Sequence, residues 1–298
     1  MISLEAQPVA PAPRPCRQDM ALGRGVMLPL GSRCLVMGIL NVTPDSFSDG
    51  GSFFDADAAV SHAARMIEDG ADILDVGAES TRPGAQPVTP EEQIRRAVPV
   101  IGRIRERFDV PISIDTSSSR VAEKALDAGA DIVNDVTAFR GDSGMIRLLA
   151  ERGAPAIAMH MQGTPRTMQQ SPSYRDVVLD ILRFLEERLS AAAAGGVAVD
   201  RVLVDPGFGF GKTLDHNLSL LNRLAEFHRL GRPLVVGTSR KAMIGAVLGG
   251  LPVGERLMGT AATVAASVAR GAHVVRVHDV KQMVQVVRMT EAIEGAKG

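Results

Sequence analysis

The chain has 298 residues, of which 45% are hydrophobic and 22% charged, so it can bury a sizeable core. A formal charge of −1 gives no reason to expect nucleic acid or an anionic membrane as a partner, and 3% aromatic residues leave little surface for stacking bases. Cys16 and Cys34 are too far apart for a zinc knuckle and suit a reducing compartment, which favours a cytoplasmic location. The sequence contains no run of about 18 apolar residues, so no membrane span is predicted.

Residues 1–31 are expected to form a flexible leader. The stretch MISLEAQPVAPAPRPCRQD at its start is rich in proline and alanine and lacks the apolar centre of a signal peptide. The folded domain is therefore expected to span residues 32–294.

Eight short apolar runs follow, and each predicts a β-strand. Most are continuously apolar rather than alternating, as expected for a parallel sheet that is covered on both faces. In chain order they are residues 34–40, 72–76, 111–114, 131–135, 156–160, 201–205, 233–237 and 273–277.

The segments between these runs have helical patterns. A Gly-Ala pair follows four of them, at 70–71, 129–130, 153–154 and 271–272, and glycine in that place is typical of a left-handed helix cap. Residues 175–189 and 279–289 carry apolar residues at helical spacing, and Asp279 is expected to cap the second of these helices.

Eight strands alternating with eight helices over about 250 residues predict a single (β/α)8 barrel, also called a TIM barrel. An open, doubly wound α/β sheet is the alternative. It is less favoured because no G-x-G-x-x-G motif follows the first strand.

Polar residues gather at one end of the predicted strands. In a barrel of this kind the active site lies at the C-terminal strand ends and in the loops after them. Acids and amides there suit the edge of a planar heterocycle, whereas arginine and histidine suit phosphate. These residues are Asn41, Asp75, Asp115, Asn134, Asp135, His160, Asp205, Lys241, Arg276 and His278.

Other chemistries have weaker support. His160 is as compatible with a structural role as with a catalytic one. The segment GTSRK at 237–241 resembles a serine-hydrolase elbow until its last position, but no companion base for Ser239 is evident. The sequence has no closely spaced pair of histidines, which argues against a zinc site. A site for Mg²⁺, held by an amide oxygen and by substrate phosphates, remains an alternative.

The segment DPGFGFGKT at 205–213 ends like the phosphate-binding motif G-x-x-x-x-G-K-[ST]. The first glycine of that motif is replaced by Pro206, which has a fixed φ and no N–H to offer a phosphate. Two long loops at 41–55 and 77–93 are rich in small and polar residues, and we expect them to close over a substrate.

Eight motifs together resemble bacterial dihydropteroate synthases along essentially the whole barrel. They are MGILNVTPDSFSDGG (37–51), ESTRPGA (79–85), SIDTS (113–117), IVNDV (132–136), MHMQG (159–163), DPGFGFGK (205–212), SRKAMIG (239–245) and RVHD (276–279). The resemblance implies a pterin-binding (β/α)8 barrel that joins 6-hydroxymethyl-7,8-dihydropterin pyrophosphate to p-aminobenzoate, a step in folate synthesis. It also implies Mg²⁺ as cofactor, a cytoplasmic homodimer, and inhibition by sulfonamides.

The resemblance assigns roles to residues at the matching positions. Catalysis would rest on Asp115, Lys241, Arg276 and His278. The pterin would contact Asp115, Asn134, Met159, Asp205, Phe210 and Lys241. The pyrophosphate would contact Asn41, Arg82, Arg276 and His278, with Asn41 also a ligand of Mg²⁺. The p-aminobenzoate would contact Phe47, Thr81, Arg82, Pro83 and Lys241.

In this setting the segment 205–213 resembles a phosphate loop in composition only. Asp205 would face the pterin, the glycines at 207, 209 and 211 would let the backbone turn beside it, and Lys212 would be a solvated loop residue. Two positions depart from the family pattern. Ala78 stands where glycine is common, and Ala242 stands where a serine often meets the p-aminobenzoate carboxylate.

The implied mechanism is a dissociative displacement at the pterin methylene. Pyrophosphate leaves with Mg²⁺, Arg276 and His278 nearby, Asp115 offsets the cationic methylene, and the aryl amine attacks. Two alternatives are a methyltetrahydrofolate:corrinoid methyltransferase on the same kind of barrel and a paralogue that binds pterins without catalysis. The pyrophosphate residues favour the synthase over both.

Overall fold

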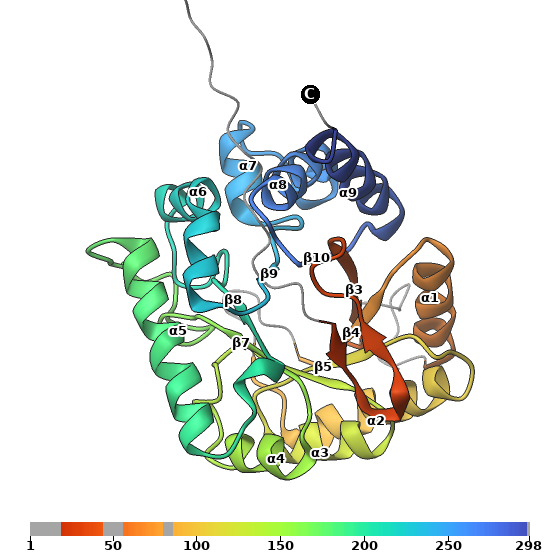
Figure 1. The fold of residues 1–298 in the computed structure, drawn as a ribbon. Coiled ribbons are helices and arrows are strands. Elements are labelled where there is room, and N and C mark those ends of the chain that lie inside the picture. The colour runs from red at the N-terminus through yellow and green to blue at the C-terminus, as the bar shows by residue number, and fades with distance from the viewer. Residues whose placement is uncertain (1–18, 44–55, 80–85, 297–298) are drawn as a thin grey trace, which may run out of the picture.

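The computed structural model describes residues 19–43, 56–79 and 86–296. Its centre is one sheet of eight parallel strands, surrounded by helices in Figure 1. All eight predicted strands are confirmed. They are β3 (Leu35–Asn41), β4 (Ile73–Gly77), β5 (Ile112–Asp115), β6 (Ile132–Asp135), β7 (Ala156–Met159), β8 (Val202–Asp205), β9 (Val235–Val236) and β10 (Val274–Val277).

The sheet closes into a barrel. Its strands pair in the order β8-β7-β6-β5-β4-β3-β10-β9. The remaining gap, between β8 and β9, is joined by a parallel bridge from Val204 to Leu234, and the Val204 N–H donates to the Pro233 carbonyl at 2.9 Å. The predicted (β/α)8 barrel is therefore confirmed, and the doubly wound alternative is wrong.

Helices follow the strands and cover the outside of the sheet. They are α1 (Ala56–Glu68), α2 (Pro90–Arg105), α3 (Ser119–Asp127), α4 (Met145–Arg152), α5 (Val177–Ala194), α6 (Leu214–Asn222), α7 (Ala242–Val247), α8 (Leu257–Ala269) and α9 (Val280–Glu294). Short 3₁₀ segments are η1 (Gly23–Gly25), η3 (Val199–Arg201), η4 (Leu224–Leu230) and η5 (Val253–Glu255).

The helix ends agree with the sequence in most details. The four glycines that precede alanine at predicted helix ends all have positive φ; they are Gly70, Gly129, Gly153 and Gly271. Asp176 caps α5 by accepting from Val178 and Leu179. Asp279 occupies the N-cap position of α9 as predicted, but its side chain makes no capping bond there and instead accepts from Arg240 Nε at 3.0 Å.

The lower end of the barrel, where the strands begin, is filled by apolar side chains. A two-stranded antiparallel hairpin of β1 (Met20–Ala21) and β2 (Met27–Leu28) packs against them. This cluster, the barrel floor, contains Met20, Leu22, Leu28, Leu30, Leu35, Met37, Ile73, Ile132, Ile157, Leu203, Val235 and Val274. The expectation of a flexible leader up to residue 31 is therefore wrong from Met20 onward, since this part belongs to the core; residues 1–18 lie outside the described residues.

Within the described ranges, no helix combines the length and the apolar character that a membrane crossing needs.

Candidate functional site

Polar side chains form a layer directly above the barrel floor. Successive side chains of a strand point to opposite faces, so residues two apart share a face. Ile73 lies in the floor, and Asp75 therefore points into the barrel one layer higher. The same step of two residues leads from a floor residue to Asn134, Met159, Asp205 and Arg276.

Arg276 is the centre of this layer. Its Nε donates to Asp75 Oδ2 at 2.6 Å, and its Nη2 donates to Asp115 Oδ2 at 2.8 Å. Asn134 Nδ2 donates to the same Asp75 carboxylate, at 3.2 Å from Oδ2. Four residues from four strands are thus held in one network, and Asp75, which is fully buried, joins them.

The environment of Asp115 changes its acidity. Burial raises the pKa of Asp115 to about 7, against the attraction of Arg276 and with a smaller contribution from the Asp75 carboxylate. A positive charge that forms beside this carboxyl group would favour its ionised form.

Asp205, Lys241 and Phe210 lie on the opposite side of the polar layer from Asp75. Burial raises the pKa of Asp205 to about 6, although Gly207 N–H donates to its Oδ1 at 2.7 Å. The Lys241 ammonium lies 4.2 Å from the centroid of the Phe210 ring, a cation–π contact. Burial lowers the pKa of Lys241 to about 8, and the charge of Arg276 adds to that shift.

An apolar wall stands beside these charges. Phe210 packs with four other buried side chains into a separate small cluster, which consists of Val136, Met159, Met161, Met168 and Phe210. Carboxylates and an amide next to a flat apolar wall can hold a planar ring with several N–H donors.

Two further predicted residues lie at the strand ends. Asn41 and Asp115 both approach the side of Gly77 on which a side chain would stand. A methyl group on Gly77 would lie 3.7 Å from Asn41 Oδ1 and 3.8 Å from Asp115 Oδ2. Asn41 is therefore a neighbour of Asp115. His278 follows β10, and its Nδ1 lies 3.0 Å from Ser239 Oγ.

Comparisons with known proteins agree with this geometry. A family model described as pterin binding enzyme matches residues 37–278. The dihydropteroate synthase of Escherichia coli strain K12 is 50% identical over 262 residues, which are 88% of this chain and 92% of that protein.

The chain belongs to the dihydropteroate synthase family.

Solved structures of dihydropteroate synthases have the same fold. The Yersinia pestis enzyme with a sulfonamide drug complex is 45% identical with a TM-score of 0.89, covering 94% of this chain and 100% of that one. The Xanthomonas albilineans enzyme with 4-aminobenzoic acid is 43% identical with a TM-score of 0.86, covering 92% of this chain and 97% of that one.

The structure brings together most residues that the dihydropteroate synthase resemblance singled out. Those on the inner face or at the strand ends are Asn41, Asp115, Asn134, Met159, Asp205, Phe210, Lys241, Arg276 and His278. Four predicted residues of the two long loops, Phe47, Thr81, Arg82 and Pro83, lie outside the described residues.

Three residues were missed or misjudged from the sequence. Asp75 was noted at a strand end but given no role, although its contacts to Arg276 and Asn134 join the network. Ser239 does have a histidine partner, His278, which lies 39 residues away. Lys212 is buried rather than solvated, so that expectation is wrong.

His160 has the structural role that the sequence left open. Its ring is buried and packs edge-on against Phe184, with the ring centroids 4.8 Å apart. Burial lowers the pKa of His160 to about 2, and the charge of Lys212 adds to that shift. A neutral, enclosed imidazole of this kind supports its neighbours and does not reach the polar layer.

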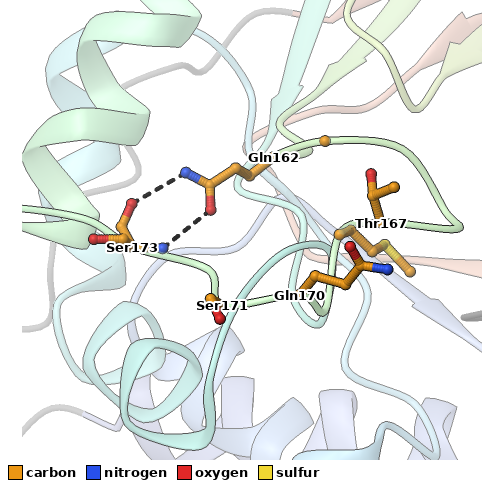
Figure 2. Close-up of a pocket in the computed structure, with 7 residues that line it drawn as sticks. Gln162, Thr167, Gln170, Ser171 and Ser173 are labelled. Carbon is orange, nitrogen blue, oxygen red and sulfur yellow. Dashed lines mark hydrogen bonds between the residues drawn. The ribbon is translucent and has the colours of Figure 1, made fainter.

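A cavity of about 310 Å³ lies in the loop after β7 (Figure 2). The side chain of Gln162 spans this loop, since its Nε2 donates to the Ser173 carbonyl at 3.1 Å and its Oε1 accepts from the Ser173 N–H at 3.2 Å. None of the residues of the polar layer lines it, and only Met168 connects it to the apolar wall. The cavity is therefore separate from the polar layer.

Proposed function

We propose that the protein condenses 6-hydroxymethyl-7,8-dihydropterin pyrophosphate with p-aminobenzoate, giving 7,8-dihydropteroate and pyrophosphate in folate synthesis. One observation carries the proposal: a polar layer of Asp115, Asn134 and Asp205 lies above an apolar floor and beside the ring of Phe210. Membership of the dihydropteroate synthase family supports it. It also favours the synthase over a corrinoid methyltransferase or a non-catalytic paralogue.

The pterin would lie flat in the barrel mouth. Its ring would pack on Phe210 and Met159, while Asp205 and Asn134 bind the N–H groups and the carbonyl of its edge. Lys241, already stacked on Phe210, would donate to an acceptor atom of the ring. Asp115 would lie under the reacting side, because Arg276 holds it there.

Pyrophosphate would bind above Arg276. The guanidinium uses its Nε and one Nη for Asp75 and Asp115, and its planar fork still has further N–H groups for an anion. His278, fixed through its Nδ1 by Ser239, would present its other nitrogen to the same anion.

The residues fit Mg²⁺ only in a site shared with the substrate. No cluster of three or more His, Cys, Asp or Glu residues able to hold a metal exists among residues 19–43, 56–79 and 86–296. Asn41 offers one amide oxygen beside Asp115, which suits a hard cation that keeps most of its contacts to phosphate and water. Bound there, Mg²⁺ would neutralise charge on the leaving pyrophosphate.

In the reaction, the C–O bond between methylene and pyrophosphate would break first, and its electron pair would leave with the pyrophosphate. The Asp115 carboxylate would stabilise the positive methylene, which is conjugated with the electron-rich dihydropterin. The amine nitrogen of p-aminobenzoate would then form the new C–N bond and release a proton to water. An aryl amine is neutral at pH 7, so no strong general base is needed.

The p-aminobenzoate end of the site is the least defined part. Lys241 precedes Ala242, the first residue of α7, and no side-chain hydrogen bond caps that short helix. Ala78 is buried, and its carbonyl accepts from Arg96 Nη1 at 3.2 Å, which fixes the base of the second long loop. Sulfonamides, as in the Yersinia pestis complex, would compete for this end.

A product assay tests the function. Purified protein, the two substrates and Mg²⁺ should yield dihydropteroate, detected by chromatography with mass detection, and chelation of Mg²⁺ should stop the reaction. Asp115→Asn should lower the rate by about 100-fold or more, since it removes a charge that stabilises the transition state. Asp127→Asn, in a surface ion pair of α3, should leave it unchanged. Absence of product with pterin binding intact would overturn the proposal.

We also propose a homodimer, with a cytoplasmic location. Helix α6 packs against α7 and α8, and these elements with η5 expose several large apolar side chains. They are Leu214, Leu218, Val247, Leu248, Val253 and Met258. Apolar groups gathered in this way mark an interaction surface, and a second copy of the chain would cover it.

A further inference from the structure

Side chains bind both the N–H and the carbonyl of Gly207 and Gly209 in the segment from Asp205 to Lys212, and the carbonyls of Phe210 and Gly211. Gly207, Gly209 and Gly211 have φ values of +71°, +80° and +66°, so its turns rely on glycine. The contacts come from α6 and from the loop between β7 and α5. Asn217 Oδ1 of α6 accepts from Gly209 N at 2.7 Å, while Gln169 Nε2 and Tyr174 OH of the loop donate to Gly209 O at 2.6 Å and to Gly211 O at 2.7 Å.

Lys212 makes the contacts at the centre of this segment. Its Nζ lies 2.8 Å from the Gly207 carbonyl, 3.0 Å from the Phe210 carbonyl and 3.0 Å from His160 Nδ1. The side chain is buried, with only 3% of the residue exposed. An ammonium has three N–H donors, and three acceptors meet it here, with His160 then carrying its proton on Nε2.

The turn at Gly207 packs closely against the residue that follows β7. A methyl group on Gly207 would lie 1.9 Å from the His160 carbonyl, so the segment touches the end of β7 directly. The buried Phe210 carbonyl needs a buried donor, and the Gly207 carbonyl accepts from Lys212 in addition to the Phe210 N–H at 3.1 Å. Lysine is long enough to reach both from the end of the same segment.

The groups that Lys212 holds are those that form the pterin site. Phe210, whose carbonyl it binds, presents its ring to Lys241 and to the apolar wall. Gly207, whose carbonyl it also binds, donates its N–H to Asp205 Oδ1. Lys212 therefore helps to set the spacing between the Asp205 carboxylate and the Phe210 ring, since it binds both ends of the turn that joins them.

We propose that Lys212 is a positioning residue for the pterin site: its buried ammonium fixes the Gly207–Phe210 turn and places a positive charge behind Asp205. The proposal rests on the proposed function and deepens it.

The charges around Asp205 supply a readout specific to this role. Lys212 on the same segment, Lys241 after β9 and Arg276 on β10 face Asp205, and His160 is the titratable group at the end of β7. Burial raises the pKa of Asp205 and these three cations oppose the rise. Burial also lowers the pKa of Lys212 well below its usual value, and Lys241 adds to that shift. The carboxylate of Asp205 and the three acceptors around Nζ favour the charged ammonium.

The test measures the affinity of 6-hydroxymethyl-7,8-dihydropterin by calorimetry between about pH 5.5 and 8, a window around the pKa of Asp205. Affinity in the wild type should fall as pH drops through about 6, because a protonated Asp205 no longer accepts two N–H bonds. Lys212→Met should weaken binding by about tenfold or more and move this fall to higher pH. A change that merely loosened the fold would lower affinity without moving the midpoint.

Tyr174→Phe is the matched control, because it removes another hydrogen bond to the same segment but no charge. Its affinity should change by less than about threefold with the midpoint unmoved. Lys212→Gln keeps a donor and removes the charge, and it serves if the methionine variant does not fold. Wild-type affinity and midpoint in a folded Lys212 variant would overturn the inference, whereas a wild type that binds no pterin would instead overturn the proposed function.

Discussion

At the scale of single residues, the site is a balance of buried charges. Arg276 is bonded to Asp75 and Asp115, and the charges of Lys241, Lys212 and Arg276 act on Asp205. Because each charge is held by another, the loss of one partner leaves an uncompensated charge in a poorly solvated place. Substitutions here should therefore affect binding more strongly than their direct contact to a ligand would suggest.

Lys241 should contribute strongly to pterin affinity. Lys241→Met should weaken pterin binding by about tenfold, through loss of its donor and of the cation on Phe210. Because the pKa of Lys241 is lowered to about 8, the wild type should lose this advantage as pH rises through 8, where the amine becomes neutral. Calorimetry between about pH 6.5 and 9 measures both effects.

The control for this prediction is Lys281→Met on the exposed side of α9. It should bind pterin like the wild type at every pH. Equal affinity of the Lys241 variant and the wild type at pH 7 would contradict the assignment of Lys241 to the pterin.

The sequence predicts part of this residue-level picture. Strand-end acids could be found because the site of a (β/α)8 barrel always lies at that end. The burial of Lys212 was not predicted because it donates to the backbone carbonyls of Gly207 and Phe210. Every residue has a backbone carbonyl, so the sequence does not show which ones bind a buried lysine. The pairing of Ser239 with His278 was missed because it joins two strands 39 residues apart.

At the scale of elements, continuous apolar runs made all eight barrel strands predictable, since each is covered by helices outside and by side chains inside. The β1–β2 hairpin could not be found in that way. Its strands have two residues each and follow a stretch rich in proline and alanine. Their burial depends on the barrel floor, which exists only after the eight strands have closed.

The hairpin should contribute measurably to stability. Leu28→Ala should lower the free energy of unfolding by about 2–4 kcal/mol, because Leu28 is almost fully buried in the barrel floor. Met27→Ala, its neighbour on the exposed face, should cost less than about 0.5 kcal/mol. Urea unfolding followed by circular dichroism measures both, and equal losses would show that the hairpin does not plug the barrel.

At the scale of the whole molecule, the exposed apolar side chains on α6–α8 predict self-association. Met258→Glu should convert a dimer into a monomer in sedimentation experiments, because it puts a charge at the most exposed of these apolar side chains. Met27→Glu, on the hairpin, is the control and should leave the mass unchanged. A wild type that sediments as a single chain at micromolar concentration would contradict the homodimer.

The closed barrel floor determines where ligands can enter and leave the barrel. Leu28 and Leu30 close one end of the described part of the barrel, so a ligand can reach the polar layer only through the barrel mouth. A ring bound on the polar layer would lie directly above the closed floor. Substrates and products would all have to pass through that one opening.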